Sequence, residues 1–148
     1  MKKLTKTTRA ALALSCTAAL ALCPTVICAE EVTLFDGIGK ATAYIDTDDG
    51  LTIYTWGGKP VAYLDDDNVF GFNGRHLGWF ADGVVWDHAG YASCALKIRM
   101  QSTQFEPFKA FKQFKPFKSF KEFAPLRPIF QNGFGTSLCA VLLSSGGT

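Results

Sequence analysis

Residues 69–80 read Val69-Phe70-Gly71-Phe72-Asn73-Gly74-Arg75-His76-Leu77-Gly78-Trp79-Phe80, and this stretch is one copy of a pattern that occurs four times. Each copy is centred on a glycine, with an aromatic residue four positions before it and, in three copies, another five positions after it. The glycines are 19, 16 and 16 residues apart, and a near-constant period of this length indicates a repeat architecture. The glycines are Gly39, Gly58, Gly74 and Gly90, and the aromatic residues are Phe35, Tyr54, Phe70, Trp86, Tyr44, Tyr63 and Trp79.

Each copy is predicted to form a β-hairpin. Asn73-Gly74 lies between two aromatic-rich runs and predicts a type I′ turn, which requires a positive φ at both central residues. The linkers between copies are rich in aspartate, a turn-forming residue. An isolated hairpin is marginally stable in water, so the four are expected to close around a shared centre. The sequence therefore predicts an all-β domain over residues 30–98, with four consecutive hairpin repeats in a pseudo-fourfold radial arrangement.

The second and third copies resemble a known family. The runs Gly58-Lys59-Pro60-Val61-Ala62-Tyr63-Leu64-Asp65 and Val69 to Phe80 are similar to the 4-fold beta flower domain family, and the likeness extends over residues 32–96. This resemblance implies four β-hairpins related by pseudo-fourfold symmetry. It implies no established activity and therefore assigns no catalytic residue. The fourth copy departs from the pattern, because Ala95 replaces an aromatic residue and Tyr91 replaces a base.

A second period follows the repeats. Phenylalanine recurs at every third position from Phe105 to Phe123, and a lysine follows each phenylalanine in the middle of this run. A period of three fits polyproline II, which has three residues per turn and places the two residue types on separate edges. Residues 99–130 are therefore predicted to be an extended basic and aromatic tail, and residues 131–148 a partly flexible segment that can add a short strand. The tail residues expected to interact are Phe108, Lys109, Phe111, Lys112, Phe114, Lys115, Phe117, Lys118, Phe120 and Lys121.

Charge divides along the chain. Residues 30–98 hold eleven acidic and four basic residues, a net charge of −7, whereas residues 99–148 hold seven basic and two acidic residues, a net charge of +5. Seven regularly spaced phenylalanines are unfavourable in water, because burying one side chain stabilises by about 1.5–3 kcal/mol. The tail is therefore expected to dock on its own acidic domain, on another copy, or on an envelope or membrane surface. Nucleic acid is not an expected partner for an exported protein.

The N-terminal stretch predicts export. Lys2, Lys3 and other basic residues precede a mostly apolar run, and Ala29 offers a small residue for cleavage before Glu30. Residues 1–29 therefore read as a secretory signal peptide for a periplasmic or secreted protein. An uncleaved anchor and a lipoprotein are the alternatives. After cleavage two cysteines remain, Cys94 and Cys139, which either form a disulfide or stay as two buried thiols.

The sequence contains no convergent catalytic set. His76 and His88 lack the spacing of metal ligands, and His76 is expected at a solvent-facing strand position. The aspartate clusters are interpreted as solvated turns in preference to calcium sites, because they lack an EF-hand frame. The three tryptophans either pack within the domain or form a platform for sugars. We therefore expect no cofactor, metal or catalytic residue, and an exported, non-enzymatic structural or binding protein. Membrane-surface activity and glycan binding are the alternatives.

Overall fold

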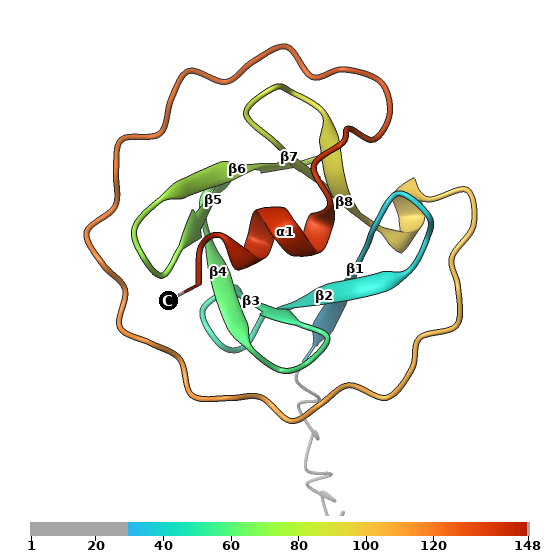
Figure 1. Ribbon diagram of the computed structural model, residues 1–148, viewed down its shortest axis with the longest axis horizontal. Helices are drawn as coiled ribbons and strands as arrows, with labels where there is room; N and C mark the ends of the chain where they lie inside the picture. Colours follow the sequence, from blue (N-terminus) through green and yellow to red (C-terminus); the bar gives the residue numbers. More distant parts are fainter. Residues whose placement is uncertain (1–29, 148) are drawn as a thin grey trace, which may run out of the picture.

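The computed structural model describes residues 30–147, so the predicted signal peptide lies outside the described residues. Eight antiparallel strands pair in chain order, and β1 also pairs with β8, which closes the sheet into a barrel (Figure 1). This confirms the predicted all-β fold built from consecutive hairpins. The strands are β1 (Glu31–Phe35), β2 (Ala41–Asp46), β3 (Thr52–Thr55), β4 (Pro60–Asp65), β5 (Asn68–Gly71), β6 (His76–Ala81), β7 (Val84–Trp86) and β8 (Ala92–Leu96), followed by the 3-10 helix η1 (Lys97–Arg99) and the helix α1 (Cys139–Ser144).

The four repeat hairpins share one turn geometry, over residues 36–40, 55–59, 71–75 and 87–91. In each hairpin turn the central glycine has a φ of 77–84° and donates its N–H to the carbonyl oxygen three residues earlier. The residue before the glycine does not have a positive φ, so the predicted type I′ turn at Asn73-Gly74 is wrong. The loop is a three-residue one that ends in a left-handed glycine. This geometry accepts Ile38 before Gly39, whereas a positive φ would strain a β-branched residue.

Two consecutive residues with positive φ, as in a type I′ turn, occur instead in a link between two repeats. Both Asp82 and Gly83 have a positive φ, of 52° and 75°, between β6 and β7. The corresponding links at Leu51 and Asp66 also contain a residue with positive φ. These links join strands that pair directly, so the repeats are continuous with one another in the barrel wall.

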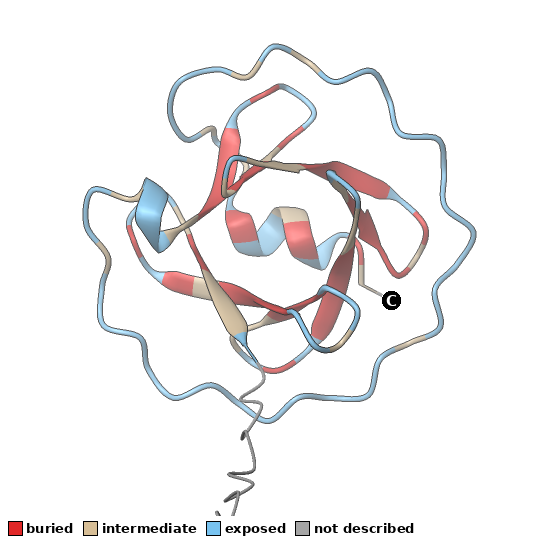
Figure 2. Cartoon of the chain, turned by 180° about the vertical axis from the view of Figure 1, so that it is seen from behind, coloured by how far each residue is buried: buried red, intermediate tan, exposed pale blue. Residues whose placement is uncertain are grey.

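The barrel lumen is filled by the C-terminal helix. Side chains alternate between the two faces of each strand, and one face contributes residues such as Ile45 and Val85 to a cluster with Cys139 and Leu143 of α1. Figure 1 shows α1 at the centre of the barrel, and Figure 2 shows that most of the surrounding wall is buried. Small residues such as Ala62 in the same cluster leave room for the helix. A single core therefore joins residues from both ends of the described chain.

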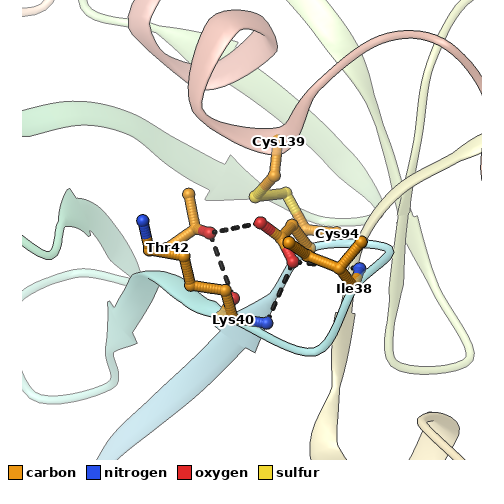
Figure 3. The surroundings of a disulfide bond; sticks show 6 residues. Ile38, Lys40, Thr42, Cys94 and Cys139 are labelled. Atoms are coloured by element: carbon orange, nitrogen blue, oxygen red, sulfur yellow. Dashed lines mark hydrogen bonds between the residues drawn. A yellow bond between two sulfur atoms is a disulfide. The ribbon is translucent and has the colours of Figure 1, made fainter. Parts of the chain in front are cut away.

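A disulfide joins α1 to the barrel wall. Cys94 of β8 and Cys139 are bonded, with their Cα atoms 5.1 Å apart. Figure 3 shows this bond beside the first hairpin turn and the start of β2, where Ile38, Lys40 and Thr42 lie. Both cysteines are buried, so the bond is part of the core.

The C-terminal segment forms a helix where the sequence suggested an added strand. A closed barrel leaves no free strand edge, and the segment makes only one isolated parallel bridge to the wall, between Phe134 and Ala92 of β8. The residues after α1 are also held in place, because the Asn73 side-chain amide donates to the Ser145 carbonyl oxygen at 2.9 Å and its backbone N–H donates to Gly146. The segment therefore completes the core and contacts the third hairpin turn.

Residues 101–131, which we call the ring, run around the outside of the barrel (Figure 1). They form no helix or strand, and Figure 2 shows that most of the ring is exposed. After the ring the chain turns inward to α1. Across residues 30–147 we find no helix with the length and apolar character needed to cross a membrane.

Replacing both cysteines by alanine is expected to lower the free energy of unfolding by about 4 kcal/mol, because the disulfide closes a long loop in the unfolded chain. The two cysteines are 45 residues apart in sequence. Urea unfolding of the wild-type and variant chains under oxidising conditions measures the difference. Equal midpoints would show that the disulfide does not constrain the chain.

Candidate functional site

The ring distributes three kinds of contact over its three-residue period. From residue 105 on, the first position carries an apolar side chain, the second carries all six cations of the ring, and the third supplies backbone N–H groups to the hairpin turns. The second and third positions contact the barrel, and the apolar side chains at the first position face away from it. The candidate functional site is the surface that this arrangement leaves exposed.

The ring backbone is hydrogen-bonded to all four hairpin turns at intervals of nine residues. At each turn a ring N–H donates to the carbonyl oxygen of the central glycine at 2.8–2.9 Å. The second and third turns receive another bond, from Ala110 to Trp56 and from Ser119 to Phe72. The matching position at the fourth turn is Pro128, which has no N–H to donate. The donors to the glycines are Gln104 for Gly39, Gln113 for Gly58, Glu122 for Gly74 and Gln131 for Gly90.

The hairpin-turn glycines also allow the ring to approach closely. A methyl group on Gly58 or Gly74 would lie 2.0 Å from a carbonyl oxygen of the ring, and on Gly39 or Gly90 it would lie 2.6 Å from one. Atoms cannot approach this closely without moving the backbone. Glycine is therefore required at these positions both for its left-handed conformation and for the ring contact.

The ring returns to the strand from which it began. The Ala92 N–H of β8 donates to the Gly133 carbonyl oxygen at 3.2 Å, and the Gly135 N–H donates back to Ala92 at 2.9 Å. Just before this contact, Phe130 stacks on Trp86 with ring centroids 4.4 Å apart and planes 8° apart. Together with the disulfide to β8, these contacts fix the end of the ring.

The cations of the ring point toward the barrel and pair with its acidic residues. Lys118 differs from the others in lying over the Tyr63 ring, with Nζ 3.7 Å from the ring centroid. This arrangement places the basic tail on the acidic domain and pairs their opposite charges. The ion pairs are Lys109 with Glu31, Lys112 with Glu31 and Asp46, Lys115 with Asp49, Lys121 with Asp65, and Arg127 with Asp67.

Aromatic residues of the repeats form the surface under these cations. Lys109 Nζ lies 4.5 Å from the Tyr44 ring centroid, and Lys121 Nζ lies 5.4 Å from that of Phe70. A cation over an aromatic face contributes about 0.5–1 kcal/mol at exposed sites. The repeat aromatics thus separate the barrel wall from the ring, and most of them are buried.

The ion pairs shift the pKa values of their members. Burial alone would raise the pKa of Glu31, but hydrogen bonds from Lys109 and Lys112 hold it below its usual range. Burial would likewise lower the pKa of Lys112, and its bonds to Asp46 and Glu31 raise it instead. The charged forms of these partners are therefore favoured in the folded protein.

The apolar side chains of the ring point away from the barrel. Nine of them, which we call the rim, have exposed fractions of 84–103%. No other described segment carries so many exposed large apolar residues in a row. The rim consists of Phe105, Phe108, Phe111, Phe114, Phe117, Phe120, Phe123, Leu126 and Ile129.

The comparison with protein families covers both the barrel and the ring. The family model of the 4-fold beta flower protein matches residues 32–143. The chain is a member of this family. The match extends beyond the repeats to α1, so the beta flower includes the ring and the helix as well as the hairpins. No match was found among curated proteins or among solved structures.

The beta flower separates residues that the sequence grouped as one interacting tail. The lysines of the tail contact the barrel, whereas the seven phenylalanines of the rim are exposed. The aspartate-rich links were expected to be solvated, but Asp46 is buried and paired with Lys112, and Asp49 accepts hydrogen bonds from Tyr54 and Lys115. These acids therefore hold the ring.

One of the two histidines also differs from the expectation. His76 is buried and does not face solvent: its Nδ1 lies 3.0 Å from Nε2 of His88, and its Nε2 lies 3.1 Å from Oδ1 of Asn68. Its backbone N–H donates to the carboxylate of Glu122 on the ring. Burial, together with the nearby His88, lowers the pKa of His76 to about 4. Within residues 30–147 no three His, Cys, Asp or Glu side chains group closely enough to hold a metal ion.

A nine-residue repeat in the tail would have identified the ring contacts. Gln104, Gln113, Glu122 and Gln131 are nine residues apart, and prolines recur with the same period between them. Nine residues correspond to one hairpin repeat, so the longer period predicts a tail that passes one turn after another. The three-residue period alone does not show this correspondence.

Gly74→Ala is expected to destabilise the protein by at least about 2 kcal/mol more than Gly50→Ala, in which the strain of a left-handed alanine is about 1–2 kcal/mol. Both glycines have a positive φ, but a methyl group on Gly50 meets no atom within 4 Å. The difference between the two variants therefore isolates the ring contact. Urea unfolding measures stability, and hydrogen exchange at Glu122 reports ring attachment. Equal destabilisation would contradict the role of Gly74 in seating the ring.

Stability is expected to fall as the pH is lowered from 6.5 to 4, because the unfolded chain binds a proton at His76 that the folded chain excludes. The usual pKa is 6.5 and the folded value is about 4, so the loss at pH 4 is at most about 3 kcal/mol. His76→Gln should remove this slope. The depressed pKa of Glu31 places its own effect below pH 4.5. Denaturant unfolding across this pH range tests the expectation, and an unchanged slope in the variant would refute it.

Proposed function

We propose that this beta flower is an exported, non-enzymatic binding module whose binding surface is the rim. The observation that carries the proposal is the exposure of nine large apolar side chains on a ring that is fixed to the barrel. A flexible tail could collapse to hide its phenylalanines. The hydrogen bonds, ion pairs and disulfide described above oppose such a collapse.

The rim exceeds what an isolated protein exposes. Each aromatic side chain can bury about 150–250 Å², so the rim offers on the order of 1,500 Å² of apolar surface. The largest apolar patch on a typical monomer is about 300–600 Å² and is often functional. Burying each rim side chain against a partner would contribute about 1.5–3 kcal/mol.

The direction of the cations favours an uncharged partner. Five of the six ring cations already pair with carboxylates of the barrel, and Lys118 lies over Tyr63. The tail therefore has few free charges with which to bind an anionic envelope component. A partner that recognises the rim would do so through apolar contact.

The buried disulfide supports the proposal of export. Disulfides form and persist in oxidising compartments and are rare in the cytosol, and the bond between Cys94 and Cys139 belongs to the core. A non-enzymatic role is supported by the partners of the polar groups at the ring. His76, Asp46 and Asp49 each contact residues that hold the fold together.

The glycan alternative receives less support than the rim. Trp79 is buried, Trp86 is covered by the stacked ring of Phe130, and Trp56 is half-buried with Lys109 Nζ 5.5 Å from its ring centroid. The three tryptophans therefore do not form an open platform for a sugar. Membrane binding, the other alternative, is compatible with an exposed apolar rim.

Replacing Phe111, Phe114 and Phe117 by serine is expected to reduce retention on a phenyl-substituted matrix, because these side chains supply the apolar contact. The control variant replaces Ile38, Ile98 and Leu138, three exposed apolar residues outside the rim. It should elute close to the wild type. Both variants must keep the wild-type unfolding midpoint, since the replaced side chains are exposed. Equal retention of the wild type and the rim variant would contradict the proposal.

A further inference from the structure

We infer that the rim binds lipid acyl chains and that its course around the barrel lets opposite sides of one molecule hold two membranes together. This inference rests on the proposed function, and it specifies both the partner and the number of surfaces bound. It follows from three features of the rim: its lack of charge, the wide spacing between its side chains, and its continuation around the barrel.

The rim lacks the charges that would direct it to an anionic surface. The side chain after most rim residues is a cation that turns back to the barrel, for example Lys112 toward Asp46 and Lys115 toward Asp49. An apolar side chain that faces away from its own ion pairs can enter the acyl region without carrying a charge with it. Binding should therefore depend little on ionic strength or on anionic lipid.

The spacing of the rim favours a fluid partner over a second copy. Neighbouring rim residues are three positions apart, at most about 10–11 Å along an extended chain. Lipid chains can fill the space around each separate side chain. Edge-to-edge contact between two copies would use an arc of about three side chains, or about 450–750 Å² per copy. A stable protein interface buries about 800 Å² per partner, so this contact is too small.

The rim extends around most of the barrel, and this makes the molecule multivalent. Nine residues of the ring pass one hairpin turn, so rim residues eighteen positions apart lie at turns on opposite sides of the barrel. Figure 1 shows the ring running around the whole barrel. We divide the rim into a first arc (Phe105, Phe108, Phe111), a middle arc (Phe114, Phe117, Phe120) and a last arc (Phe123, Leu126, Ile129). The first and last arcs face opposite directions, so a flat membrane that touches one leaves the other free.

The experiment mixes the full chain with phosphatidylcholine vesicles that carry donor or acceptor dyes in separate populations. Co-sedimentation measures binding, and energy transfer between the populations measures bridging. We expect binding at both low and high ionic strength, with a severalfold rise in energy transfer and in particle size. Adding phosphatidylglycerol should change binding little. A requirement for anionic lipid, or loss of binding in high salt, would overturn the inference.

Two variants separate bridging from binding. Replacing the middle arc by serine leaves two opposite arcs, and we expect this variant to bridge vesicles as the wild type does. Replacing the first and last arcs leaves the middle arc, and this variant should bind without bridging when compared at equal bound protein. Both variants keep residues 1–29, so the difference between them reports the rim. Bridging by the middle arc alone, or binding of the wild type without bridging, would overturn the multivalent arrangement.

The outcomes also distinguish this inference from the function on which it rests. Failure of the wild type to bind vesicles, together with rim-dependent retention on the phenyl matrix, would leave an apolar binding surface whose partner is not lipid. Rim-dependent self-association in solution would identify a second copy as that partner. Loss of both vesicle binding and matrix retention would remove the proposed function as well.

Discussion

A carbonyl oxygen of the ring lies close to where a side chain would begin at each hairpin-turn glycine, and the other features of the structure depend on this approach. It brings the ring N–H groups within reach of the glycine carbonyl oxygens, at 2.8–2.9 Å. It also brings the ring cations within reach of the acidic residues and aromatic rings of the barrel. Larger side chains at the glycines would hold the ring away and weaken all of these contacts together.

The outward direction of the phenylalanines follows from the contacts of their neighbours. In a chain with a period of three, successive residues face three directions. The acidic barrel attracts the cations, and the hairpin turns accept the backbone N–H groups of the third position. The remaining direction faces away from the barrel. The rim is thus exposed because polar contacts hold the other two positions, although its own side chains would gain from burial.

Much of the barrel could be predicted from the sequence, because its signals are local. The glycine period, the aromatic positions and the aspartate links each depend on neighbouring residues, and they indicated four hairpins. The predicted turn type was wrong because Asn-Gly occurs both in type I′ turns and in three-residue loops that end in a left-handed glycine. Ile38 and Ala89 occupy the position of Asn73 in two other copies, and such residues favour the three-residue loop, in which this position has a negative φ.

The position of α1 and the surroundings of His76 could not be read from the sequence in the same way. Whether Leu143 fills a lumen depends on the closure of the barrel, and the burial of His76 depends on residues brought together from the ring and a neighbouring hairpin. The ring could be predicted in part, less well than the hairpins and better than the position of α1. A nine-residue period is visible in the sequence at Gln104, Gln113, Glu122 and Gln131. It predicts contacts with the barrel only when it is compared with the distance between successive hairpin turns.

The bond between Cys94 and Cys139 keeps the chain covalently connected if a protease cuts the ring. Both ends of the ring are attached to β8, one through the chain and the other through sulfur. Hydrolysis of any one peptide bond between these cysteines therefore leaves the two fragments covalently joined. An exposed, lysine-rich segment without regular secondary structure is open to such cleavage, and the nicked molecule would still keep its central helix tethered in the lumen.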